Sequence, residues 1–164
     1  MDKHRLAEIT IRTMTIDDSD AIAEMWLALV AFHQALDPSL PGAAPGGQHR
    51  YVRRLMERLN DPYTRTFVAE VDGRVAGFVL GMIVDLMQDI FAQQPGGFLA
   101  DIYVEPEYRH QGVGTALVDA LKDWFRENKI GFFEWHVAAR NQDGIAFWQS
   151  VGGREVMLRM RTDI

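Results

Sequence analysis

Residues 104–114 read Val-Glu-Pro-Glu-Tyr-Arg-His-Gln-Gly-Val-Gly and lie between a strongly apolar segment and a segment with helical periodicity. Glycines at positions 112 and 114 let the backbone turn tightly and approach a ligand closely. The helix that follows begins with unpaired N–H groups and the positive end of its dipole, which together favour an anion. The stretch therefore predicts a site for a phosphate or pyrophosphate between a strand and a helix.

The segments on either side of this loop alternate between strand and helix patterns. The pair Asp72-Gly73 between two apolar runs is a strong hairpin signal. The expected elements are a strand over 9–14, helices over 22–32 and 48–59, strands over 66–71, 75–84 and 98–105, a helix over 115–128, a strand over 132–138, a helix over 143–151 and a strand over 154–160. This β-α-α-β-β-β-α-β-α-β order predicts the α/β class, as an α+β mixed sheet with helices on both faces. We expect a single domain over residues 1–164, with residues 85–97 as an unassigned insertion.

The composition narrows the classes of function. The chain has 164 residues, of which 48% are apolar, and no cysteine. A chain of this length buries roughly 70% of its unfolded surface, so it needs no disulfide or metal to fold. The lack of cysteine excludes a thiolate metal site and a cysteine nucleophile. A formal charge of −6 repels phosphate backbones, so we expect no nucleic-acid partner.

The expectations on localisation and on metal binding rest on three signals that the sequence lacks. Residues 1–6 are charged and no signal-type apolar stretch follows them. The longest strongly apolar run, 78–84, is far shorter than the roughly 20 residues of a membrane helix, so we expect a soluble, cytoplasmic protein. His33, His49 and His110 have no metal-ligand spacing, and we expect no metal.

Two nucleotide-binding motifs offer alternative interpretations of the loop. No Gly-Lys-Ser/Thr follows the glycines, which excludes the phosphate loop of nucleotide hydrolases. A dinucleotide-binding protein remains an alternative, because Glu134 lies about 20 residues beyond Gly114, where a ribose reader could sit. However, Leu117 and Arg109 occupy the positions of two of that motif's glycines. A plain turn at the start of a helix is the structural alternative.

The pattern Arg-x-x-Gly-x-Gly at 109–114, preceded by Val-x-Pro-x-Tyr at 104–108, resembles the acetyl-CoA loop of the GNAT superfamily of N-acetyltransferases. The stretch from 141 is similar to that family's Asn-x-x-Ala-x-x-x-Tyr-x-x-x-Gly-Phe helix. The corresponding positions here are Asn141, Gly144, Trp148, Gly152 and Gly153. The resemblance is specific over residues 98–153 and extends to the rest of the chain only through the order of elements.

The resemblance implies a site for acetyl-CoA, used as a co-substrate. Strands 98–105 and 132–138 would be parallel neighbours that splay apart, with the pantetheine arm in the gap. An N–H near Val104 would polarise the thioester carbonyl. Asn141 would hold the arm from the other side. The residues implied in binding are Ile102, Tyr103, Val104, Arg109, His110, Gln111, Gly112, Val113, Gly114, Thr115 and Asn141.

The implied reaction moves the acetyl group to a primary amine. Without cysteine, direct transfer in a ternary complex is the natural scheme. There are two candidates for the general base. His136 lies where some members of the family carry a carboxylate, and Asp101 could act through an ordered water. Trp148 stands where the family has a tyrosine, and its indole N–H can donate a hydrogen bond but is no acid at physiological pH. We expect Trp148 to shape the thioester pocket, with a plain core residue as the alternative.

The acceptor is the least determined part. By the resemblance, the first helices and the insertion wall its site, and they bring aromatic and acidic residues that suit an amine-bearing cation. These residues are Trp26, Phe32, His33, Asp37, Asp85 and Asp89. A peptide N-terminus, an aminoglycoside or an amino-acid derivative fits nearly as well. A non-catalytic acyl-CoA-binding or regulatory module is the alternative from another class. We expect no membrane partner, and a homodimer stays open.

Overall fold

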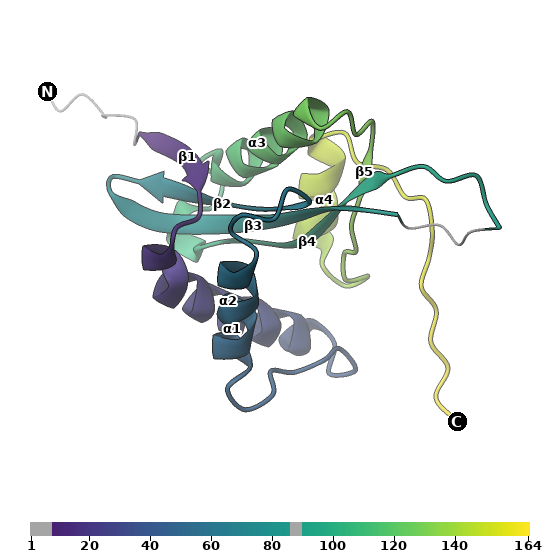
Figure 1. Ribbon diagram of the computed structural model, residues 1–164. Helices are drawn as coiled ribbons and strands as arrows, with labels where there is room; N and C mark the ends of the chain where they lie inside the picture. Colours follow the sequence, from purple (N-terminus) through teal and green to yellow (C-terminus); the bar gives the residue numbers. More distant parts are fainter. Residues whose placement is uncertain (1–7, 86–89) are drawn as a thin grey trace, which may run out of the picture.

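The computed structural model describes residues 8–85 and 90–164, in which five strands form one sheet (Figure 1). The strands lie in sequence order across the sheet. The first four pair antiparallel and the last two pair parallel. They are β1 (Ile9–Thr13), β2 (Thr64–Val71), β3 (Arg74–Val84), β4 (Gly96–Val104) and β5 (Phe133–Glu134).

Helices cover both faces of the sheet, as the sequence predicts (Figure 1). On one face lie α1 (Ser19–Leu36) and α2 (Gly47–Glu57), and on the other lie α3 (Val113–Glu127) and α4 (Gln142–Ser150). Two short 3-10 turns, Ile16–Asp18 and Pro106–Tyr108, precede α1 and α3. No helix in the described part of the chain combines the length and apolarity needed to cross a membrane.

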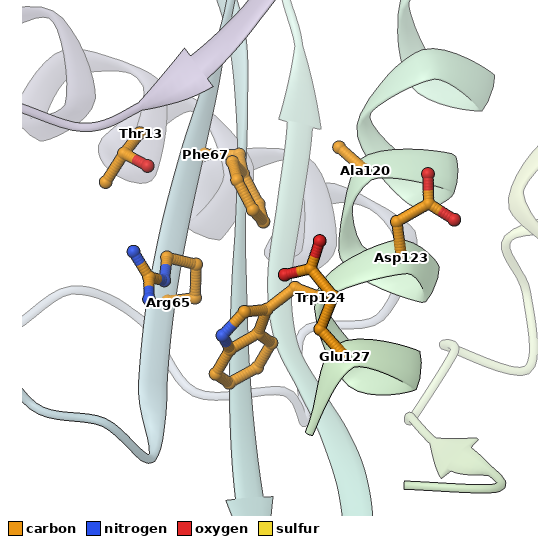
Figure 2. Close-up of a pocket in the computed structure, with 7 residues that line it drawn as sticks. All are labelled: Thr13, Arg65, Phe67, Ala120, Asp123, Trp124 and Glu127. Atoms are coloured by element: carbon orange, nitrogen blue, oxygen red, sulfur yellow. The ribbon is translucent and has the colours of Figure 1, made fainter. Parts of the chain in front are cut away.

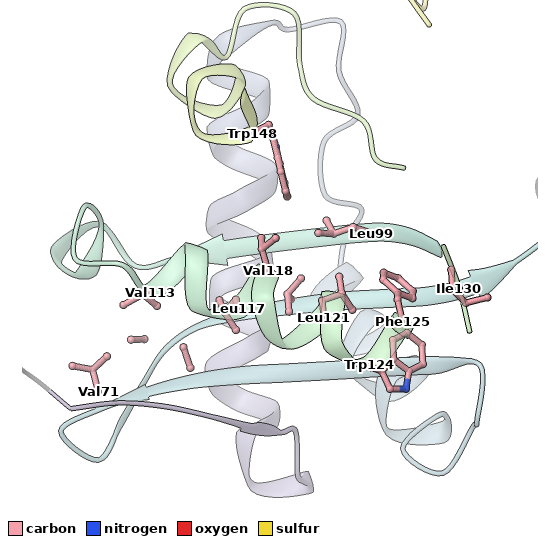
Figure 3. Packing of buried hydrophobic residues seen from close by; sticks show 13 residues of the cluster. Val71, Leu99, Val113, Leu117, Val118, Leu121, Trp124, Phe125, Ile130 and Trp148 are labelled. Carbon is pink, nitrogen blue, oxygen red and sulfur yellow. The ribbon is translucent and has the colours of Figure 1, made fainter. Parts of the chain in front are cut away.

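Each layer of helices has its own apolar cluster. Against α3, the sheet buries side chains that include Leu117, Leu121 and Trp148 (Figure 3). Against α1 and α2, it buries others that include Ile22, Leu55 and Phe78. Successive residues of the central strands therefore point alternately into the two clusters. Both faces of the sheet are covered by helices, which explains why these strands are almost continuously apolar.

The antiparallel half is closed by tight turns and an ion-pair network. Asp72 and Gly73 both have positive φ, which is the geometry of the predicted two-residue hairpin. The Arg12 guanidinium donates to both carboxylate oxygens of Asp18 at 2.8 Å and to Glu70 at 3.0 Å. This guanidinium holds the pKa of the buried Asp18 carboxyl below its ordinary value.

The parallel half is much less complete. β3 and β4 pair from Gly77 to Val84, but β4 and β5 pair only at Gly97 with Phe133 and Phe98 with Glu134. The predicted strand 132–138 is therefore shortened to two residues. The predicted divergence of these two strands is confirmed, because the chain after Glu134 no longer pairs with β4.

The predicted strand over 154–160 is wrong for the chain as it stands in this structure. Residues after Gly153 form no helix or strand. Their apolar side chains are exposed, from 60% at Val156 to 88% at Met157. The alternating pattern is real, but within the described residues no neighbouring strand pairs with this segment, and hydrogen bonds to a neighbour are what make a strand.

Candidate active site

The loop after β4 is held in shape by its own side chains. Arg109 donates from Nε to the Val104 carbonyl at 2.8 Å, and its guanidinium lies 5.4 Å from the centre of the Tyr103 ring. Gln111 donates from Nε2 to the Glu107 carbonyl at 2.7 Å. These contacts tie the loop to the end of β4, so its backbone is positioned before any ligand arrives.

Gly112 sets the direction of α3. Its φ is +87°, a left-handed conformation that favours glycine, and a Cβ there would meet no other atom. The first helical hydrogen bond runs from the Ala116 N–H to the Gly112 carbonyl. The N–H groups of Val113, Gly114 and Thr115 precede that bond and have no helical acceptor. These are the N–H groups on which the predicted anion site depends.

Gly114 has a different role from Gly112. A Cβ at Gly114 would lie 3.3 Å from the ring of Phe147 on α4, so this glycine allows the two helices to approach closely. His110, also expected in the loop, has φ of +59°, which is uncommon for a residue with a Cβ. A strained residue in a loop of this kind is typical of a functional site.

A β-bulge in β4 re-aims the side chains that follow it. The pairing passes from Leu80 opposite Asp101 to Gly81 opposite Leu99, so Ala100 is the extra residue. Leu99 packs in the cluster against α3, whereas Asp101 contacts α2 on the other face. Without the bulge, the alternation of a strand would place both side chains on one face.

Asp101 is the centre of a small half-buried polar group. The Tyr51 hydroxyl donates to its Oδ2 at 2.9 Å, and the ring of Trp26 stacks on Tyr51 at 5.1 Å between centroids. Burial raises the pKa of the Asp101 carboxyl, and the Tyr51 hydrogen bond and the charge of His33 act in the opposite direction. Burial also raises the pKa of Tyr51, so its hydroxyl stays a donor. A half-buried carboxyl with a raised pKa is suited to accept a proton.

The second predicted base lies on the same face. His136 is exposed, and its ring meets Phe98 edge-on at 5.5 Å between centroids. Phe133 and Trp135 pack toward α3, so strand alternation places Glu134 and His136 on the opposite side. The structure thus brings Asp101 on β4 and His136, two residues beyond the end of β5, to one side of the sheet.

Trp148 lies on the other face. It is 7% exposed, and its ring lies 4.4 Å from that of Trp135 and 5.1 Å from that of Phe147, measured between centroids. It belongs to the apolar cluster against α3 (Figure 3). Asn141, at the start of the same helix, accepts a hydrogen bond from the Gly144 N–H at 2.9 Å and caps α4.

The residues expected around the acceptor divide into two groups. Trp26 stacks on Tyr51, which donates to Asp101, and the charge of His33 acts on the Asp101 carboxyl. Phe32 meets His33 edge-on, and Asp37 pairs with Arg140 and accepts from the Ser39 N–H. Asp89 lies outside the described residues.

A cavity of about 350 Å³ opens elsewhere, where β2 meets the second half of α3 (Figure 2). Arg65 and Trp124 face one another there, with the guanidinium carbon 5.8 Å from the ring centre. The cavity is separate from the loop at the start of α3. In the described part of the chain, no three His, Asp or Glu side chains gather closely enough to hold a metal ion.

Comparison with known proteins agrees with this geometry. A model of the acetyltransferase (GNAT) family matches residues 29–152, which is most of the chain and includes the bulged strand, the loop and α4. The chain belongs to the GNAT family. The divergent strands, the loop and α3 of this structure are thus the elements that the sequence resemblance assigns to acetyl-CoA.

Individual GNAT relatives are more distant. An uncharacterised N-acetyltransferase of Methanocaldococcus jannaschii is 28% identical over 89% of this chain and 61% of its own length. An aminoglycoside N(6′)-acetyltransferase type 1 of Stenotrophomonas maltophilia is 30% identical over 72% of this chain and 68% of its own. The chain therefore spans less than two thirds of the archaeal relative's length.

A solved structure shows the same GNAT fold. The aminoglycoside acetyltransferase AAC(6′)-Iy, in complex with a bisubstrate analogue built on CoA, superimposes with a TM-score of 0.68. The match covers 94% of this chain and 99% of that one, at 20% identity.

Sequence reasoning missed two features of this GNAT site. Tyr51 has the spacing of a residue on the apolar face of its helix, and nothing in the pattern shows that its hydroxyl reaches a strand 50 positions away. No sequence pattern predicts the bulge at Ala100, although the bulge decides which face Asp101 occupies. The one signal that could have pointed to the unusual position of Asp101 is an acidic residue within an otherwise apolar strand.

Proposed function

We propose that this protein is an acetyl-CoA-dependent N-acetyltransferase that moves the acetyl group directly to a primary amine of a small cationic molecule. The observation that carries the proposal is that a loop with unpaired helix N–H groups at the start of α3 follows the strand that holds the half-buried Asp101. The family match and the CoA-analogue complex of a structural neighbour support the choice of acetyl-CoA.

The residues present fit the CoA moiety. The amides of 113–115 and the left-handed Gly112 offer N–H groups to a pyrophosphate, and the unpaired edge of β4 beyond Phe98 offers backbone groups to a pantetheine arm. Ile102, Tyr103 and Val104 lie along that edge. Bound there, the co-substrate supplies an acetyl group activated as a thioester.

Asp101 takes the proton of the acceptor amine. An alkylammonium has a pKa near 10.4 and must lose its proton before it can attack a carbonyl. A half-buried carboxylate with a raised pKa accepts that proton, directly or through a water, and Tyr51 fixes the carboxylate by its hydrogen bond. His136, just beyond the end of β5, is the alternative base.

Trp148 forms part of the wall behind the site. Its burial between Trp135 and Phe147 supports packing rather than proton transfer. We expect Trp148→Phe to bind CoA with unchanged affinity and to keep its turnover, which steady-state kinetics and calorimetry would check. Loss of turnover with normal CoA binding would instead assign the indole N–H a role at the leaving thiolate.

Two observations favour a cationic acceptor. The carboxyl of Asp101 accepts from Tyr51, whose ring is stacked on Trp26, and aromatic faces and carboxylates attract ammonium groups. The Stenotrophomonas relative is by name an aminoglycoside acetyltransferase. We therefore rank aminoglycosides and polyamines ahead of peptide amines.

The test is thiol release from acetyl-CoA with a panel of aminoglycosides, polyamines, amino acids and peptides. The protein has no cysteine, so it adds no background thiol. Turnover with one class of amine would establish the activity and its acceptor together. CoA binding without turnover on any amine would support a binding module, and absence of CoA binding would refute the proposal.

A further inference from the structure

A charged side chain interrupts the apolar face that β2 turns toward α3. Phe67, Ala69 and Val71 alternate along the strand and pack in the cluster against α3. The same alternation places Arg65 on this face. Arg65 is half-buried and lines the cavity between β2 and the second half of α3 (Figure 2). A guanidinium at a position where the strand otherwise presents apolar side chains calls for a partner, because charged groups are costly to remove from water unpaired.

The Arg65 guanidinium is incompletely satisfied by the protein. Within residues 8–85 and 90–164, its buried Nε has no hydrogen-bond partner. The guanidinium lies over the ring of Trp124, with its central carbon 5.8 Å from the ring centre. This stacking holds the side chain in place but accepts none of its N–H groups in a strong hydrogen bond. The planar fork of an arginine matches the two oxygens of a carboxylate, so an anion in the cavity would supply the missing acceptor.

The part of the cavity wall that α3 contributes is acidic. Asp123 and Glu127 lie one helical turn apart and both line the cavity. The Asp123 carboxylate is already paired with Arg126 at 2.6 Å. Glu127 is exposed, and no basic side chain of the described residues pairs with it, Arg65 included. The cavity therefore has a cation on β2 and an anion on α3 that do not neutralise one another.

The size and the apolar surface of the cavity suit a small molecule. Its volume of about 350 Å³ is at the lower end of the range for ligand sites, roughly 300–1,000 Å³. Phe67, Ala120 and Trp124 provide apolar surface between the charged groups. Glu127 lies about 20 Å along α3 from Gly114, so the cavity is separate from the loop that the CoA pyrophosphate would occupy.

We propose that this cavity is a second ligand site and that its ligand is a free α-amino acid. The carboxylate of the ligand accepts from Arg65, its ammonium group lies beside Glu127, and its side chain packs against Trp124. An α-amino acid carries both charges on one carbon, so one small molecule neutralises both walls. A simple anion would leave Glu127 facing it, and a simple cation would face Arg65. Binding at this site does not depend on the proposed reaction.

The first test follows the indole N–H signals of the full chain by NMR while each standard L-amino acid is added in turn. The chain has four tryptophans, and Trp124→Phe identifies the signal of Trp124. We expect at least one amino acid to shift that signal in a saturable way. The matching amine without the carboxylate and the matching acid without the ammonium group should each bind about tenfold more weakly or worse. A Trp124 signal that no amino acid moves would overturn the proposal.

The second test removes each charge of the cavity in turn. We expect Arg65→Met to lower the affinity for that amino acid about 10- to 100-fold, measured by calorimetry. Arg74→Met, at an exposed arginine on β3 outside the cavity, is the matched control and should bind as the wild type does. Glu127→Gln, at an exposed helix position, keeps the test valid if Arg65→Met does not fold, and should weaken binding about two- to fivefold. Unchanged affinity in these cavity variants, with shifts around Asp101 instead, would place the amino acid at the acceptor site and overturn the proposal.

Discussion

The two edges of β4 differ in how completely a neighbouring strand pairs with them. On one side β3 pairs with it at eight positions, and on the other β5 pairs with it at two. The fully paired side buries a continuous apolar core on both faces of the sheet. The open side leaves backbone donors and acceptors without a strand, next to the loop that begins α3. The contrast separates a scaffold from a place where a ligand can act as the missing strand.

The same division holds for charge. In the paired half, Arg12, Asp18 and Glu70 form a network whose partners satisfy one another. At the open half, Asp101 has only the Tyr51 hydroxyl as a hydrogen-bond donor in the described chain, and its pKa is raised by burial. A satisfied carboxylate stabilises a fold, whereas an incompletely satisfied one is available for proton transfer.

Replacing Asp101 should have the largest effect on activity. We expect Asp101→Asn to lower kcat by about 10²- to 10³-fold, because the amide cannot accept the proton of the acceptor. CoA affinity should be unchanged. Asp123→Asn, at a surface ion pair with Arg126 on the far half of α3, is the control and should leave kcat as it is. Full activity of Asp101→Asn would transfer the role to His136.

Removing Arg12 should affect the paired half alone. We expect Arg12→Ala to lower the free energy of unfolding by about 2 kcal/mol, measured in denaturant, with unchanged kinetics at temperatures where the variant is folded. The lowered pKa of Asp18 gives the network a contribution that is present above the ordinary value of 3.8 and lost as pH falls through the folded-state pKa. The stabilities of the two proteins should therefore converge in acid.

Substitution of two glycines with similar backbone conformations should distinguish the open half of the sheet from the paired half. Gly112 and Gly73 both have positive φ and open space where a Cβ would sit. Alanine at either position costs about 1–2 kcal/mol if the conformation is kept. Gly112→Ala should weaken CoA binding about tenfold in calorimetry, because the loop amides move. Gly73→Ala, in the β2–β3 hairpin, should lower stability without that loss; equal CoA affinities would contradict the loop assignment.

The smallest predicted effect is a shift of a pH profile. Asp101 acts as a base only when ionised, so kcat/KM should fall as pH drops through its raised pKa. The Tyr51 hydrogen bond lowers that pKa. Tyr51→Phe should therefore move the acidic limb to higher pH and leave the limiting rate at high pH nearly unchanged. An unmoved limb would mean that Asp101 does not set it.

The sequence predicts the scaffold better than the site. Period-two and helical patterns, the Asp72-Gly73 turn and the loop motif locate nearly every element, because these depend on local chemistry. The predictions that fail concern features that depend on non-local contacts. In the described chain the segment over 154–160 has no strand partner, and the bulge at Ala100 turns Asp101 toward α2. The Tyr51–Asp101 pair joins residues 50 apart and could not be found from spacing.

The most direct test of this account is to map CoA on the chain by amide NMR shifts in a titration. We predict that the largest changes occur at the amides of 111–115 and along the two divergent strands, at 102–104 and 134–138, while β1 and the β2–β3 hairpin stay still. Changes centred instead on the cavity around Arg65 and Trp124, with a silent α3 loop, would contradict the assignment of the open edge of β4 as the CoA site.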